Sequence, residues 1–67
     1  MKGYRGYWKE GNRRGKGTEI CPNGDQYKGK WENNKKEGYG VLIDRDEKIL
    51  KNGTWRSGIF IKAKKVK

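Results

Sequence analysis

The chain has 67 residues, of which 30% are hydrophobic and 39% are charged, and it carries a formal net charge of +10 with no histidine. A chain of this length forms one small domain, and its single cysteine excludes an internal disulfide and a metal site built from several cysteines. No apolar run reaches the ~20 residues of a membrane-spanning helix, and the N-terminus lacks the apolar stretch of a signal peptide, so the sequence predicts an intracellular protein, soluble or peripherally membrane-associated.

Residues 4–9 have the residue pattern of a β-strand, because large aromatic residues alternate with glycine. Tyr4, Gly6 and Trp8 share one face of this strand. The absence of a side chain at Gly6 lets the two rings lean over the backbone. A helix is disfavoured, since each glycine costs a helix about 1 kcal/mol.

A hairpin is predicted next, with its turn at residues 10–14 and its returning strand at residues 15–21. Gly11 and Asn12 both tolerate the positive φ of a tight turn. Gly17 faces the aromatic side, where a β-carbon would push the rings away. The glycines are therefore interpreted as structural, and a phosphate-binding loop is not supported because no helix follows them.

The remaining elements repeat this order. Pro22 followed by Asn23-Gly24 is a strong signal for a tight turn, and Cys21 beside it is predicted to be a half-buried structural thiol. Further turns are expected at residues 33–36 and 44–47. Strands are expected at residues 27–32, 38–44, 49–56 and 59–61, and the basic segment 62–67 is expected to fray.

Three tryptophans mark an internal repeat of the pattern Y-x-G-x-W-x-x-G-x-x-x-G-x-G. Trp8, Trp31 and Trp55 are separated by 23 and then 24 residues, and a fixed period of this size is typical of a repeat architecture. In the second copy Asn34 replaces a glycine. In the third copy Lys51 replaces the tyrosine, and the counterparts of two glycines are lysines at 62 and 64.

These residues resemble MORN repeats (membrane occupation and recognition nexus), with two nearly full copies and one remnant between residue 4 and about residue 58. The resemblance implies an all-β fold in which consecutive antiparallel β-hairpins form one twisted, open repeat sheet of about two and a half repeats. A single domain would span residues 1–67, with repeats near 4–26, 27–50 and, in part, 51–61, and a basic tail at 62–67.

The resemblance also implies structural roles for the residues of the motif, with the tyrosines and tryptophans stacking one repeat on the next. These residues are Tyr4, Gly6, Trp8, Gly11, Gly15, Gly17, Tyr27, Gly29, Trp31, Gly38, Gly40, Gly53, Trp55 and Gly58.

No catalytic residue, cofactor site or metal site is expected. The chain has no histidine, and no nucleophile with a neighbouring base can be named. The first hypothesis is a non-catalytic scaffold that binds a protein partner or a second copy of itself as a homodimer, because two and a half repeats leave a sheet edge open.

The second hypothesis is peripheral binding to anionic phospholipid membranes through basic turns and the C-terminal segment, where residues 48–67 contain seven basic residues and no acidic one. The alternative is that these basic residues are merely solvated. Nucleic acid ranks lower, because only Tyr7 and Tyr39 are not needed for packing. The candidate anion-binding residues are Arg13, Arg14, Lys35, Lys36, Lys62, Lys64, Lys65 and Lys67.

Overall fold

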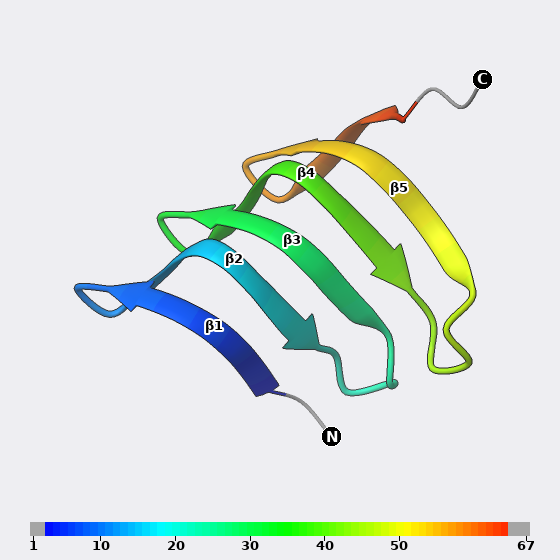
Figure 1. The fold of residues 1–67 in the computed structure, drawn as a ribbon, viewed down its shortest axis with the longest axis horizontal. Helices are drawn as coiled ribbons and strands as arrows, with labels where there is room; N and C mark the ends of the chain where they lie inside the picture. The colour runs from blue at the N-terminus through cyan, green and yellow to red at the C-terminus, as the bar shows by residue number, and fades with distance from the viewer. Residues whose placement is uncertain (1–2, 65–67) are drawn as a thin grey trace.

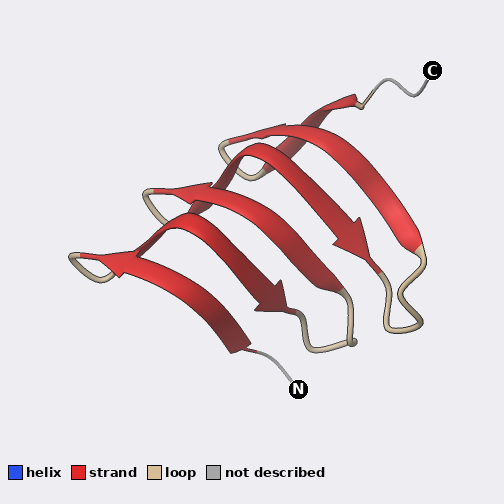
Figure 2. Cartoon of the chain, in the orientation of Figure 1, coloured by secondary structure: helices blue, strands red, loops and turns tan. Residues whose placement is uncertain are grey.

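The computed structural model describes residues 3–64 and shows one antiparallel sheet of six strands, ordered as they occur in the chain (Figures 1 and 2). The open, all-β hairpin sheet predicted from the sequence is thereby confirmed. The strands are β1 (Gly3–Lys9), β2 (Asn12–Ile20), β3 (Gln26–Glu32), β4 (Lys35–Ile43), β5 (Ile49–Arg56) and β6 (Ile59–Ala63). Lys65 and Lys67, two of the candidate anion-binding residues, lie outside the described part of the chain.

Three equivalent two-residue turns close the hairpins. Their φ angles are 53° and 83° at Glu10 and Gly11, 49° and 72° at Asn33 and Asn34, and 51° and 85° at Ser57 and Gly58. Two successive positive φ angles define the type I′ turn, whose twist matches that of the flanking strands. The turn position occupied by glycine in two hairpins is thus occupied by asparagine in the second, a residue that tolerates this conformation.

The predicted turns at residues 10–14 and 33–36 are too long. Strand pairing resumes directly after each type I′ turn, so Asn12 already pairs with Lys9 and Lys35 with Glu32. The basic pairs 13–14 and 35–36 therefore lie in β2 and β4 rather than in turns. Because neighbouring strand residues point to opposite faces, each basic pair is divided between the two faces of the sheet.

The turns at the other end of the hairpins are longer. The backbone N–H of Gly24 donates to the carbonyl of Cys21 at 2.9 Å, and the N–H of Cys21 donates to the carbonyl of Asp25 at 2.8 Å. The thiol of Cys21 is half-buried, as predicted. In the next turn Oδ1 of Asp44 accepts from the backbone N–H of Asp46 at 2.8 Å and of Lys48 at 2.9 Å.

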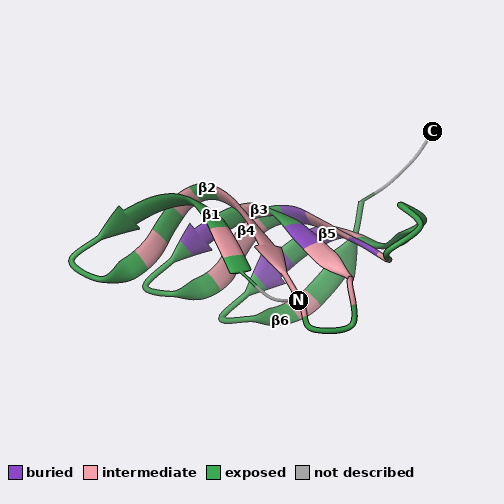
Figure 3. Ribbon diagram, turned by 90° about the horizontal axis from the view of Figure 1, so that it is seen from below, coloured by how far each residue is buried: buried purple, intermediate pink, exposed green. Residues whose placement is uncertain are grey.

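A row of small residues crosses the whole sheet, and a bulge lies beside it in each hairpin. The row consists of Gly6, Gly17, Gly29, Gly40, Gly53 and Ala63, each paired with the next. The strands arch, as Figure 3 shows. The tyrosines and tryptophans of the motif lie on one side of the sheet, here called the aromatic face, while Tyr7 and Tyr39 belong to the opposite face.

The core is thin, because one sheet has no second layer to cover it. Tyr27 is fully enclosed, and it forms a buried cluster with Trp31 and Trp55, against which Tyr4, Leu42 and Phe60 pack. The principal extents of 38 × 24 × 16 Å describe an elongated plate. Stability therefore depends on contacts within the aromatic face.

Candidate binding surfaces

Six rings form a continuous ladder on the aromatic face, and each ring packs edge to face against the next. Their order is Trp8, Tyr4, Trp31, Tyr27, Trp55 and Phe60. Neighbouring ring centroids are 5.0 to 5.4 Å apart and the ring planes cross at 66° to 87°. Such contacts contribute about 0.5–1.5 kcal/mol each beyond area burial, so the ladder couples each hairpin to the next.

Hydrogen bonds fix the rings in place. The indole N–H of Trp31 donates to the carbonyl of Gly17 at 3.2 Å, and that of Trp55 donates to the carbonyl of Gly40 at 3.1 Å. Each tryptophan is thus bonded to the preceding hairpin. The hydroxyl of Tyr27 donates to the carbonyl of Lys30 at 3.0 Å.

Enclosure changes the proton affinity of these phenols. Burial raises the pKa of Tyr27 to about 12, and the negative charge of Glu37 acts in the same direction. Burial also raises the pKa of Tyr4, against the opposing charge of Arg13. The pKa of the Cys21 thiol is raised by loss of solvation and by nearby Glu19, so its reactive thiolate is disfavoured.

Two basic side chains lie over the ladder. The guanidinium of Arg13 is 4.3 Å from the centroid of Trp31 and 5.5 Å from that of Tyr4. The ammonium of Lys36 lies 5.4 Å from Tyr27 and 5.6 Å from Trp31. Cation–π contacts of this kind contribute about 0.5–1 kcal/mol at exposed sites.

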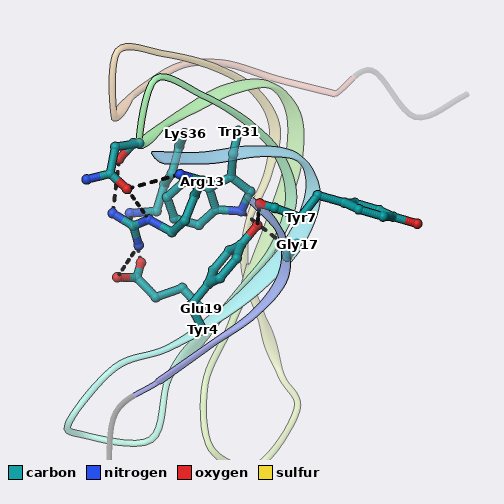
Figure 4. A network of polar contacts seen from close by, with 8 residues as sticks. Tyr4, Tyr7, Arg13, Gly17, Glu19, Trp31 and Lys36 are labelled. Carbon is teal, nitrogen blue, oxygen red and sulfur yellow. Dashed lines mark hydrogen bonds and ion pairs between the residues drawn. The ribbon is translucent and has the colours of Figure 1, made fainter. Parts of the chain in front are cut away.

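Glu19 joins these two cations. Its carboxylate is 3.3 Å from the guanidinium of Arg13 and 3.5 Å from the ammonium of Lys36. Figure 4 shows Arg13 and Glu19 in this network beside Trp31, with Tyr7 projecting away from it. Arg13 and Lys36 are therefore already engaged within the protein.

Asn34 binds the first hairpin from the turn of the second. Its Oδ1 accepts from Nε of Arg13 at 2.6 Å and from the backbone N–H of Arg13 at 3.3 Å. Its backbone N–H donates to the carbonyl of Arg13 at 3.0 Å, and the equivalent N–H of Gly58 donates to the carbonyl of Lys36 at 3.0 Å. The departure from the motif at position 34 thus supplies a contact between repeats.

The third hairpin also has a cation–π contact, but the cation is at the tyrosine position of the motif and the ring is at the position that Lys36 occupies in the second hairpin. Lys51 occupies the tyrosine position, and Phe60 pairs with Trp55 as Lys36 pairs with Trp31. The ammonium of Lys51 lies 5.3 Å from the centroid of Phe60. Phe60 lies outside the repeat motif, so the sequence pattern predicts no role for it.

Hairpin three also has a shorter bulge than hairpin one. Gly15 and Lys16 are unpaired in the β1–β2 register, whereas only Ile61 is unpaired between β5 and β6. Ala63 therefore lies opposite Gly53, and the alignment of Lys64 with Gly17 expected from counting is wrong by one residue.

The N-terminal edge of the ladder is open. Trp8 is 56% exposed, whereas Trp31 and Trp55 are buried. Within residues 3–64 its indole N–H has no hydrogen-bond partner, because no strand precedes β1 in the sheet. At this edge Trp8 presents the indole ring and N–H that Trp31 and Trp55 use to contact the preceding hairpin, but no preceding hairpin is present within residues 3–64.

The opposite face carries a shallow hollow over the second and third strands. It is lined by Lys16, Gly17, Thr18, Lys28, Gly29, Lys30 and Tyr39. The three lysines are not among the candidate anion-binding residues predicted from the sequence. Their alternation with the motif residues Gly17, Gly29 and Trp31 was the signal that places them together on the face opposite the rings.

The candidate anion-binding residues do not form one cluster. Arg13 and Lys36 lie over the ladder, whereas strand alternation places Arg14 and Lys35 on the opposite face. Lys62 in β6 pairs with Thr54, which pairs with Tyr39 in turn, so Lys62 also lies on the opposite face. The ammonium of Lys64 lies 5.3 Å from the centroid of Tyr39, also on that face.

Residues 3–64 contain no group of three or more acidic, cysteine or histidine side chains placed to hold a metal ion. They also include no helix of the length and apolarity needed to cross a bilayer.

The family model of the MORN repeat matches residues 4–26 and 27–47. A search of curated proteins found no match to the chain.

Proposed function

The chain belongs to the MORN-repeat family, and from this premise we propose that it is a non-catalytic interaction module whose N-terminal edge binds a protein strand, first of all that of a second copy. Repeat modules of this family mediate protein or membrane interactions. The observation that carries the proposal is the exposed Trp8 on an edge strand, whose indole N–H has no hydrogen-bond partner within residues 3–64.

The two edges of the sheet are complementary in hydrogen bonding. Inside the sheet, carbonyls of one hairpin accept from a turn N–H and from an indole N–H of the next. At the N-terminal edge, Gly11 and Trp8 hold the equivalent donors. At the C-terminal edge, β6 holds the equivalent acceptors in the carbonyls of Phe60 and Ala63, by register with β2 and β4.

A second copy docked in this way would extend the sheet from β6 to β1 and add one edge-to-face contact, between Trp8 and Phe60. Such a head-to-tail interface leaves one edge free on each molecule, so association continues unless a ring closes. The net charge of +10 on every copy opposes association. Added salt screens this repulsion and is expected to favour assembly.

Sedimentation velocity over a range of protein and salt concentrations tests the proposal. Association is expected to rise with both and to weaken in Trp8→Ala, whereas the matched control Tyr7→Ala, which removes an exposed ring from the opposite face of the same strand, retains it. Circular dichroism establishes that both variants are folded. A folded wild-type monomer at all concentrations, or equal association of Trp8→Ala and Tyr7→Ala, refutes the proposal.

Peripheral binding to anionic phospholipid is the second candidate. It is supported by the exposed basic residues Arg14, Lys35, Lys62 and Lys64, which lie on or reach toward the opposite face. Each basic residue near an acidic bilayer contributes about 1 kcal/mol. Co-sedimentation with phosphatidylserine vesicles is expected to exceed that with phosphatidylcholine vesicles and to fall with salt; equal sedimentation with both removes this candidate.

A further inference from the structure

Three lysines meet on the opposite face, and within residues 3–64 none of them forms an ion pair with an acidic residue. Lys16 pairs directly with Lys30, and Lys28 pairs with Thr18 two register positions further along, which is the next pair on the same face. Directly opposed residues have Cβ atoms about 4.5–5.5 Å apart, and like charges in this position destabilise a sheet. The lysines line one hollow with Thr18 and Tyr39, above the backbone of two glycines.

Acidic side chains approach this cluster at Lys30, which lines a second hollow together with Glu32 and Glu37, but they form no ion pair with it within residues 3–64. Both ion pairs found in residues 3–64 go to Glu19, which lies on the aromatic face. Glu32 and Glu37 alternate onto the opposite face, but they lie toward the turn at residues 33 and 34, and Oε1 of Glu37 accepts from the backbone N–H of Ser57 at 2.9 Å. The repulsion among the three lysines would be relieved by an anionic ligand.

Two tyrosines flank the lysines. Tyr7 is 68% exposed and Tyr39 is 46% exposed, and neither belongs to the ladder. Figure 4 shows Tyr7 projecting outward from the sheet. The ring of Tyr39 is held by its hydroxyl, which is 2.5 Å from Oδ1 of Asn52, and by the ammonium of Lys64 at 5.3 Å from its centroid.

The arrangement interleaves rings and cations across the sheet. Tyr7 on β1 and Tyr39 on β4 are separated by three strand spacings, roughly 14 Å at about 4.8 Å each. Lys16 on β2 and Lys30 on β3 lie between them. A ligand that follows this row must carry negative charge at intervals and must also present flat apolar surfaces to the rings.

We propose that the opposite face binds single-stranded nucleic acid, with Tyr7 and Tyr39 stacking on bases and Lys16, Lys28 and Lys30 contacting the intervening phosphates. Single strands offer unstacked bases and a regularly charged backbone, and exposed aromatic residues on an open sheet are suited to both. Duplex DNA offers the phosphates but not the faces of its bases. A lipid surface likewise offers anionic groups, but no ring on which the tyrosines could stack. This site is on the other side of the sheet from the ladder, so it is independent of the proposed edge interaction.

The site is tested by measuring the affinity for a labelled 20-nucleotide oligo(dT) strand by fluorescence anisotropy, at low protein concentration and at several salt concentrations. Tyr39→Leu and Tyr7→Leu are each expected to weaken binding about tenfold, and Tyr39→Phe to retain most of it. Lys16→Gln/Lys30→Gln is expected to lower the slope of log affinity against log salt by about 1.4. The matched control Arg45→Gln/Lys48→Gln removes the same charge from a distant turn and leaves the slope nearly unchanged. Circular dichroism and thermal unfolding verify that each variant is folded.

Competition with unlabelled ligands separates the classes of partner. Oligo(dT) is expected to displace the label, and the same length of duplex or phosphatidylserine vesicles to displace it far less effectively. Equal displacement by duplex, or tyrosine variants that bind as well as wild type, overturns the proposal because binding is then only electrostatic. Binding to anionic vesicles with none to oligo(dT) overturns it as well and favours the second candidate function.

Discussion

Gly40 is the position where one added methyl group tests the packing of the ladder most directly. A β-carbon at Gly40 would overlap the ring and hydroxyl oxygen of Tyr27, which is fully enclosed between Trp31 and Trp55. The ring cannot move without losing its neighbours. We therefore expect Gly40→Ala to displace Tyr27 from the core.

The expected loss follows from the contacts of that ring. Two edge-to-face contacts at about 0.5–1.5 kcal/mol each and one hydrogen bond, to Lys30, at about 1 kcal/mol give about 2–4 kcal/mol. A domain of this size has only about 3–5 kcal/mol from its core. Gly40→Ala is thus expected to be largely unfolded, or to unfold at a much lower urea concentration.

Urea unfolding followed by tryptophan fluorescence measures the effect, with two glycines as graded controls. Gly3 has no atom within 4 Å of an added β-carbon, so Gly3→Ala is expected to change the free energy of unfolding by less than about 0.5 kcal/mol. Gly17→Ala displaces Tyr4, which lies nearer the open edge and can move outward, so an intermediate loss is expected. In a Tyr27→Leu background the same change at Gly40 should cost little. If Gly40→Ala is as stable as Gly3→Ala, the ladder does not hold the fold as described.

Three further predictions concern other parts of the aromatic face. The pKa of Tyr27 is raised to about 12 from 10.0 in the folded protein, so the unfolded chain loses the phenol proton at a lower pH. The stability that this protonated phenol contributes is complete below pH 10 and is lost as pH rises toward 12. Tyr27→Phe should therefore show a smaller fall in the urea midpoint over that pH range. Asn34→Gly keeps the turn but loses the bonds of Oδ1 to Arg13, so a loss of about 0.5–1.5 kcal/mol is expected in urea unfolding, with a larger loss for Asn34→Ala; no loss in Asn34→Gly contradicts a role for the side chain. A double-mutant cycle of Lys51→Ala and Phe60→Leu should give a coupling energy of about 0.5–1 kcal/mol, and additive losses would mean that their contact contributes nothing.

Much of the fold follows from the spacing of rings and glycines in the sequence. The alternation of Tyr4, Gly6 and Trp8 predicts a strand with one aromatic face, and its recurrence predicts stacked hairpins, both of which the structure contains. The strand β6 was expected to end at residue 61 but continues to Ala63. It continues because the shorter bulge brings a small residue opposite Gly53, and a bulge leaves no mark in a strictly periodic pattern.

The positions of the basic residues were harder to predict. Arg13 and Arg14 are adjacent in sequence and were expected to act together from a turn, yet a type I′ turn of two residues places them in a strand and on opposite faces. Lys16 and Lys30 are far apart in sequence and become neighbours only through the register of β2 and β3. Charge clusters on a sheet depend on register, which composition and local spacing do not define.

The glycine row has a mechanical consequence for the whole plate. A line of residues without side chains runs across the sheet perpendicular to its strands, so the sheet is expected to bend most easily along this line, here called the crease. Tyr4 and Tyr27 act as struts over this crease, since each hydroxyl is bonded to a carbonyl three residues further along its own strand. Bending stiffness should therefore be lowest across the third hairpin, where lysine replaces the strut, and local opening should begin there.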